Sequence, residues 1–163
     1  MDSVLNLIQN PSWDIIAFLA ITACGFFWGI TYGKKALGMI IIGVYVLFAI
    51  WPFVPANIVT DGRAPVEIWA FRSGIFLALL MFVLLFLFRT FKGALFSEGI
   101  WWEILILSIL GAGLLTTILL KIAPPEIITA NPLSLSPFTL QFFSHTIFTT
   151  WWTVLPILGV LFL

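Results

Sequence analysis

Charged residues are scarce in this chain, and that scarcity excludes most soluble functions before any motif is considered. Aspartate, glutamate, lysine and arginine make up 9% of the 163 residues, whereas 62% are hydrophobic. A soluble domain is about a quarter charged, so this composition leaves too little polar surface to face water. The net charge is zero, and nucleic acid would require a basic face. The composition predicts an integral membrane protein that contacts the lipid bilayer and binds no nucleic acid.

Cysteine and histidine each occur once, which excludes several kinds of chemistry. Cys24 cannot form an intrachain disulfide, a redox pair or a cysteine zinc cluster, and we expect it to be a small buried packing residue. His145 alone offers no histidine cluster for a metal ion. We therefore predict no metal site and no cofactor.

Acids and bases are also missing from the middle of the long apolar runs. A proton-coupled transporter or pump needs such a group near the centre of the membrane, and a hydrolase needs a nucleophile with a nearby base. The sequence shows neither pattern, so we predict that the protein is not an enzyme. The polar groups within the runs are hydroxyls, which we expect to bond to their own helix backbone; they belong to Thr22, Tyr45, Ser108, Thr116 and Thr117.

Several apolar stretches approach the ~20 residues that a helix needs to cross a bilayer. They cover residues 15–32, 36–54, 66–88, 100–122 and 147–163. The last is short, but it can lengthen upstream through Phe142 and Phe143. Residues 123–137 contain four prolines and are predicted to form a loop. We therefore predict an all-α helical bundle, a single membrane domain over residues 1–163 with four or five transmembrane helices.

Local signals mark the ends of these helices. Ser12 can cap the first helix, and Pro65 suits the first turn of the third. Pro124-Pro125 ends the fourth span, and Ser136-Pro137 begins a new helix. Residues 4–9 mix aliphatic and polar side chains, which is typical of a short helix on the membrane surface.

The basic residues predict an orientation. One side of the membrane carries Lys34, Lys35, Arg89 and Lys92, and the other carries Arg63, Arg72 and Lys121. The positive-inside rule places the side with four basic residues in the cytoplasm and the N-terminus outside. Those four residues act as topology determinants or as contacts to anionic lipid.

Gly25, Gly29 and Gly33 recur every four residues and therefore lie on one stripe of the first helix. Such a bare stripe lets a second helix approach closely in lipid. Two interpretations remain open. The stripe packs against the second helix of the same chain, or it forms a self-association face or pore lining of a homo-oligomer.

A polar seam is a further candidate feature of the last helix. Gln141, His145, Thr149 and Thr153 also recur every four residues and would line one face of a continuous helix. The ordinary interpretation is interhelical hydrogen bonding near the headgroups. The functional interpretation is a hydrated path or partner surface, in which His145 titrates near neutral pH.

An ion pair on the outer side is the last candidate. Arg72 lies about 9 Å into the third span at 1.5 Å per residue, on the same predicted side as Asp14 and Glu67. Pairing of Arg72 with Asp14 or Glu67 would fix helix three to its neighbours. An enzyme site built from these three residues is the least favoured interpretation.

The first hairpin resembles the start of the colicin V production protein family. The resemblance rests on Trp13-Asp14-Ile15-Ile16, on the glycine stripe followed by Lys34-Lys35-Ala36-Leu37, and on an apolar helix with Tyr45. Residues 72–88 and 104–117 match the family's third and glycine-bearing fourth spans, so the resemblance covers roughly residues 13–117. The chain lacks an arginine after Gly113, and its ending from Ile147 has no family counterpart.

The resemblance implies a bacterial inner-membrane protein with a non-enzymatic accessory role in toxin export or envelope maintenance. It implies neither an established reaction nor a substrate. The partner we expect is a second copy of the chain or another membrane protein. The alternative is a small channel or transporter subunit that assembles through Gly25, Gly29 and Gly33.

Overall fold

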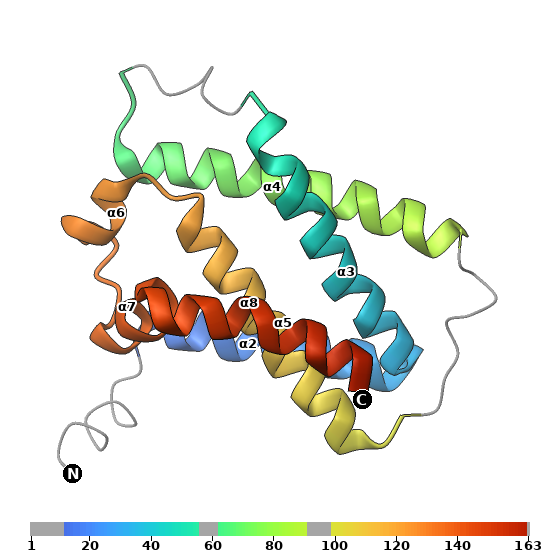
Figure 1. The fold of residues 1–163 in the computed structure, drawn as a ribbon. Helices are drawn as coiled ribbons and strands as arrows, with labels where there is room; N and C mark the ends of the chain where they lie inside the picture. Colours follow the sequence, from blue (N-terminus) through green and yellow to red (C-terminus); the bar gives the residue numbers. More distant parts are fainter. Residues whose placement is uncertain (1–11, 56–61, 91–98, 163) are drawn as a thin grey trace, which may run out of the picture.

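The computed structural model describes residues 12–55, 62–90 and 99–162. Within these residues every regular element is a helix, as Figure 1 shows. The long helices are α2 (Trp13–Tyr32), α3 (Lys34–Ile50), α4 (Pro65–Thr90), α5 (Trp101–Lys121) and α8 (Thr146–Phe162). The short ones are η1 (Trp51–Phe53), α6 (Pro125–Thr129) and α7 (Pro137–Ser144). The surface helix predicted for residues 4–9 lies outside the described residues.

Four helical segments are long and apolar enough to cross a membrane, namely α2, α3 with η1, α4 and α5. Helices α7 and α8 pass the same test only as a pair, which is bent by 65°. The predicted all-α membrane bundle is therefore confirmed, with four spans or, counting the bent pair, five.

The predicted lengthening of the last span takes the form of a bent pair of helices instead of one continuous helix. His145 has extended backbone dihedral angles, φ −71° and ψ 132°, and it ends α7. Phe142 and Phe143 therefore belong to α7, which passes the length test only together with α8. The loop predicted for residues 123–137 is also partly helical, because α6 begins at Pro125, a position that suits proline in the first helical turn.

Two of the predicted start signals hold and one does not. Pro65 is the first residue of α4, and Ser136 caps α7 by accepting a hydrogen bond from the Thr139 amide. Ser12 precedes α2 but makes no side-chain cap. Between α2 and α3, Gly33 alone reverses the chain with φ 86°, a value that favours glycine because it has no Cβ.

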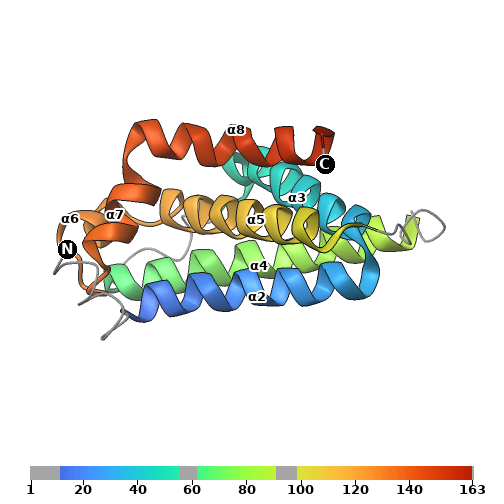
Figure 2. The same ribbon diagram turned by 90° about the horizontal axis from the view of Figure 1, so that it is seen from below.

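Helix α5 is the centre of the bundle. Figure 2 shows it between α8 on one side and α2 on the other, and α3 packs on it as well. Its glycines make these approaches close. A Cβ at Gly113 would lie 2.1 Å from the ring of Trp152 in α8, and one at Gly111 would lie 3.4 Å from Ile41 in α3. A glycine of α8 allows the same close approach, because a Cβ at Gly159 would lie 2.8 Å from Leu110 of α5.

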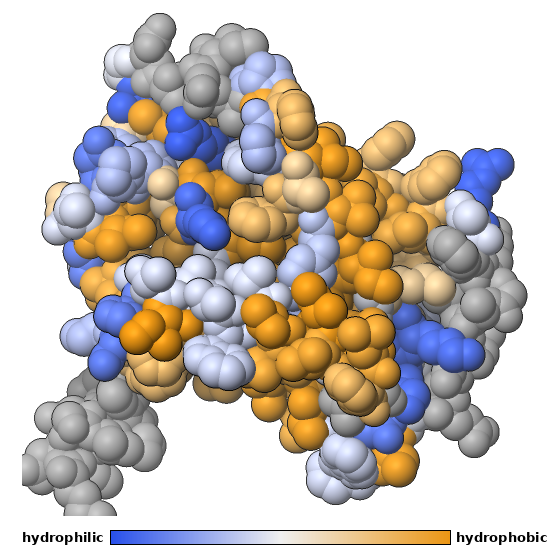
Figure 3. Space-filling model, in the orientation of Figure 1, coloured by the Kyte–Doolittle hydropathy of each residue, from blue (hydrophilic) through white to orange (hydrophobic). Residues whose placement is uncertain are grey.

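The face of the molecule seen in Figure 3 is apolar over a broad band and hydrophilic toward its two ends. Helix α4 is largely exposed, since Phe76 and Leu80 are its only buried residues. Cys24 corrects a prediction, because it is exposed on the apolar surface of α2 instead of buried. In lipid an exposed apolar side chain has no cost, so small residues need not face inward.

The approach of α8 to Gly113 predicts a large effect of one added methyl group. We expect Gly113→Ala to lower the free energy of unfolding by about 1–3 kcal/mol, because the Trp152 ring has to move. Gly74→Ala is the matched control, since nothing lies within 4 Å of a Cβ at that position. Thermal unfolding in detergent measures both variants. Equal midpoints would show that α5 and α8 do not pack as described.

Candidate functional site

The glycine stripe faces α5 within the same chain. A Cβ at Gly29 would lie 2.5 Å from Ile104 of α5 and 2.5 Å from Leu37 of α3, and one at Gly25 would lie 3.5 Å from Ser108 of α5. Gly33 serves the turn instead of the stripe. Of the two open interpretations, the geometry matches packing inside one chain, with α5 as the main neighbour.

Lys34, the first residue of α3, forms an ion pair with Glu103 of α5. Lys34 Nζ lies 2.8 Å from Glu103 Oε2, and both side chains are partly buried. Glu103 lies in the first turn of α5, where a negative charge is favoured by the helix dipole. The pair therefore fixes the α2–α3 hairpin to the start of α5. This partner of Lys34 was not predicted.

Two other candidate topology residues, Lys35 and Arg89, lie at the same end of the bundle as Lys34. Lys35 and Arg89 are exposed, at the start of α3 and in the last turn of α4. Lys92 lies outside the described residues. The positive-inside rule applies to clusters of lysine and arginine of this kind, at one end of a membrane bundle.

Asp14 does not pair with Arg72, which corrects the predicted outer-side ion pair. Its Oδ2 accepts hydrogen bonds from the Ser136 amide at 2.9 Å and from the Ser136 hydroxyl at 2.8 Å. Both residues are buried. Because Ser136 also caps α7, the start of α2 and the start of α7 are held together by one serine.

Arg72 and Trp69 contact backbone carbonyls at the end of α5. Arg72 Nη1 donates to the Ile122 carbonyl at 3.4 Å, and Trp69 Nε1 donates to the Leu119 carbonyl at 3.0 Å. Carbonyls at a helix C-terminus lack intrahelical donors, so these bonds tie α4 to the end of α5. Glu67 is exposed in the first turn of α4.

The polar seam is broken by the bend at His145. Gln141 lies on α7, whereas Thr149 and Thr153 lie on α8, so the four residues do not share one helix face. Both threonine hydroxyls donate to carbonyls one turn earlier in the chain, at 3.0 Å and 2.8 Å. His145 and Gln141 are exposed. A continuous polar stripe is therefore not formed.

The Tyr45 hydroxyl bonds to a neighbouring helix, whereas the sequence predicts a bond to its own helix backbone. Its hydroxyl donates to the Thr153 carbonyl at 2.5 Å, which joins α3 to α8. The acceptor lies in the turn of α8 that precedes Pro156. Proline distorts the local hydrogen-bond ladder, and side chains of neighbouring helices compensate in membranes.

Comparison of the chain with protein-family models, curated proteins and solved structures gives no significant match in any of the three. Among residues 12–55, 62–90 and 99–162 there is likewise no group of three histidine, cysteine, aspartate or glutamate side chains that could hold a metal ion. Several polar contacts in this part of the chain join one helix to another, among them the Lys34–Glu103 pair and the Asp14–Ser136 hydrogen bonds.

The tie between Asp14 and Ser136 predicts a stability effect. Ser136→Ala removes a helix cap and one hydrogen bond to a buried carboxylate, so we expect unfolding to become easier by about 2 kcal/mol or more. Ser136→Thr keeps the hydroxyl and should recover most of the loss. Thr31→Ala is the control, since its exposed hydroxyl bonds only to its own helix. Denaturant titration compares them; equal effects of Ser136→Ala and Thr31→Ala would contradict the tie.

The covered stripe predicts how Gly29 responds to substitution. Gly29→Leu should reduce the yield of folded protein, because Ile104 and Leu37 occupy the space, while the remaining folded protein keeps the oligomeric state of the wild type. Gly74→Leu carries the same added side chain into open space and should be tolerated. Native mass spectrometry in mild detergent reports the state. Conversion of a wild-type oligomer into stable monomers by Gly29→Leu would show a self-association face.

Proposed function

We propose that this chain is a non-enzymatic accessory protein of a bacterial inner membrane, similar in role to the colicin V production family. The observation that carries the proposal is the use made of the polar side chains. Lys34 with Glu103, Asp14 with Ser136, and Trp69 with Leu119 each join two helices. Contacts of this kind support the fold, and a stable scaffold of joined helices is what a non-enzymatic accessory role requires.

Helix α4 is the surface proposed to meet the partner. It has 26 residues, about 39 Å at 1.5 Å per residue, which exceeds the ~30 Å hydrocarbon thickness. Leu77, Met81 and Leu85 recur on one exposed face, with Phe82 and Phe86 beside them. Lipid alone can cover such a face, and a membrane protein in an accessory complex can cover it as well.

We also propose the membrane orientation that the basic residues predict. Lys34, Lys35 and Arg89 lie at the end of the bundle that we assign to the cytoplasm, and Asp14 lies at the opposite end. The N-terminus would then be outside.

The alternative function is a small channel or transporter subunit. Its proposed assembly through the glycine stripe is disfavoured by Ile104 and Leu37, which occupy the space beside Gly29. A channel would therefore have to assemble through another face, such as the exposed face of α4.

Photo-cross-linking in cells tests the accessory function against the channel. A photoreactive residue at Leu85 of α4 should give a discrete adduct with a different membrane protein, whereas one at Leu19, also exposed but on α2, should give only lipid adducts. Purified protein in liposomes should pass no ions. Homotypic adducts at Leu85 together with ion flux would support the channel, and lipid adducts at both positions would contradict an α4 partner.

A further inference from the structure

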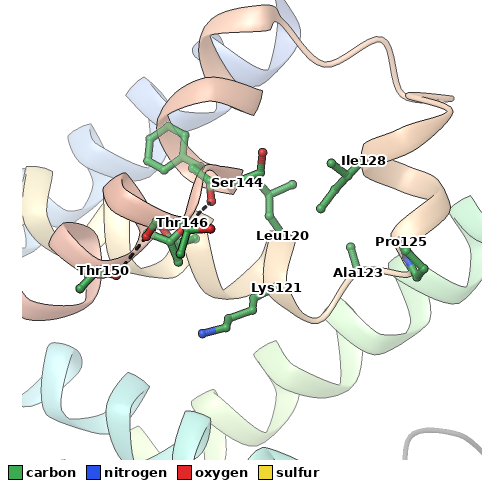
Figure 4. Close-up of a pocket in the computed structure, with 11 residues that line it drawn as sticks. Leu120, Lys121, Ala123, Pro125, Ile128, Ser144, Thr146 and Thr150 are labelled. Atoms are coloured by element: carbon green, nitrogen blue, oxygen red, sulfur yellow. Dashed lines mark hydrogen bonds between the residues drawn. The ribbon is translucent and has the colours of Figure 1, made fainter.

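An open cavity of about 430 Å³ lies between the end of α5, helix α6 and the bend from α7 to α8 (Figure 4). It joins an apolar wall to a group of polar side chains. Its lining includes Thr117, Lys121, Phe143, Thr146, Thr149 and Thr150. The proposed accessory role makes no use of it.

Thr117 lines this cavity and has an unusual environment. The sequence predicts that its hydroxyl bonds to its own helix, as Ser108 does by donating to the Ile104 carbonyl at 2.7 Å. Thr117 is only 2% exposed, yet its Oγ1 has no hydrogen-bond partner in the part of the chain that is described. A buried hydroxyl without a partner destabilises the protein, because it has lost its hydrogen bonds to water and gained none. A bound polar group would remove this cost.

Lys121 supplies a cation at the mouth of the cavity. It follows Thr117 by four residues and so lies on the same face of α5. Its Nζ lies 5.3 Å from the centre of the Phe48 ring, and it forms no ion pair with any described carboxylate. This ammonium group is therefore available to an anion.

The hydroxyls on the α7–α8 side are acceptors. Ser144, Thr149 and Thr150 donate their protons to the carbonyls of Leu140, His145 and Thr146, respectively. Their oxygen lone pairs remain open to donors. The cavity thus presents one cation and several acceptors, and a matching ligand carries one anionic group and several hydroxyl donors.

We propose that this cavity binds the headgroup of an anionic, hydroxyl-bearing phospholipid such as phosphatidylglycerol. Lys121 ends a spanning helix and therefore lies at the level of lipid headgroups, where lysine contacts phosphate. The phosphate binds Lys121, and the glycerol hydroxyls donate to the threonine oxygens. The acyl chains leave along the apolar wall that contains Leu120 and Phe143, because the cavity holds a headgroup and not a whole lipid.

Native mass spectrometry of the full chain in neutral detergent tests the proposal, with phosphatidylglycerol and phosphatidylcholine as probes. We expect one phosphatidylglycerol to be retained per chain, at least tenfold more tightly than phosphatidylcholine. Lys121→Gln should remove this preference. Lys35→Gln, which removes an exposed cation at the other end of the bundle, should keep it. Equal retention of the two lipids by the wild type, or equal losses in the two variants, would overturn the proposal.

Thr117→Val provides an independent test, because it removes the unpartnered hydroxyl while keeping the shape of the side chain. We expect the lipid-free protein to be as stable as the wild type or more stable, and to bind phosphatidylglycerol more weakly. Unchanged lipid binding would contradict a role for Thr117. Soluble glycerol 3-phosphate in millimolar excess should not displace the lipid; efficient displacement would assign the cavity to a free phosphate ester instead.

Discussion

The close approach of two helices to opposite faces of α5 is the constraint on which the rest of the bundle depends. Lipid tails are as apolar as leucine, so no hydrophobic force drives helices together inside a membrane, and close van der Waals packing has to replace it. Gly113 admits the Trp152 ring from α8, and Gly29 lets Ile104 of α5 pack against α2. Helix α5 is central because these approaches leave no room for an intervening side chain.

Polar contacts then determine how the ends of the helices are arranged. The ion pair between Lys34 and Glu103 closes one end, and the hydrogen bonds between Asp14 and Ser136 close the other. Between these ends the helices meet mainly through apolar side chains, with Tyr45 as an exception where Pro156 disturbs α8. This division keeps charges near water, where their desolvation is least costly.

Hydropathy predicts the spans well because helix length and apolar content respond to the bilayer alone. It does not predict which helix is central. The stripe of Gly25 and Gly29 predicts that another helix packs closely against α2, but the sequence does not say which helix. The three-dimensional arrangement shows that it is α5. The bend at His145 was missed for a related reason. No proline or glycine occurs between Pro137 and Thr146, so the pattern from Gln141 to Thr153 is that of a continuous helix, and tertiary packing overrides it.

The bend at His145 also determines where the polar cavity lies. Helix α7 ends at Ser144 and α8 begins at Thr146, so Thr149 and Thr150 line the same cavity as Lys121 at the end of α5. Thr117, whose buried hydroxyl has no partner among the described residues, lines this cavity as well. The break in the last helix and the unpartnered hydroxyl therefore belong to one feature of the bundle, which is where we propose that a lipid headgroup binds.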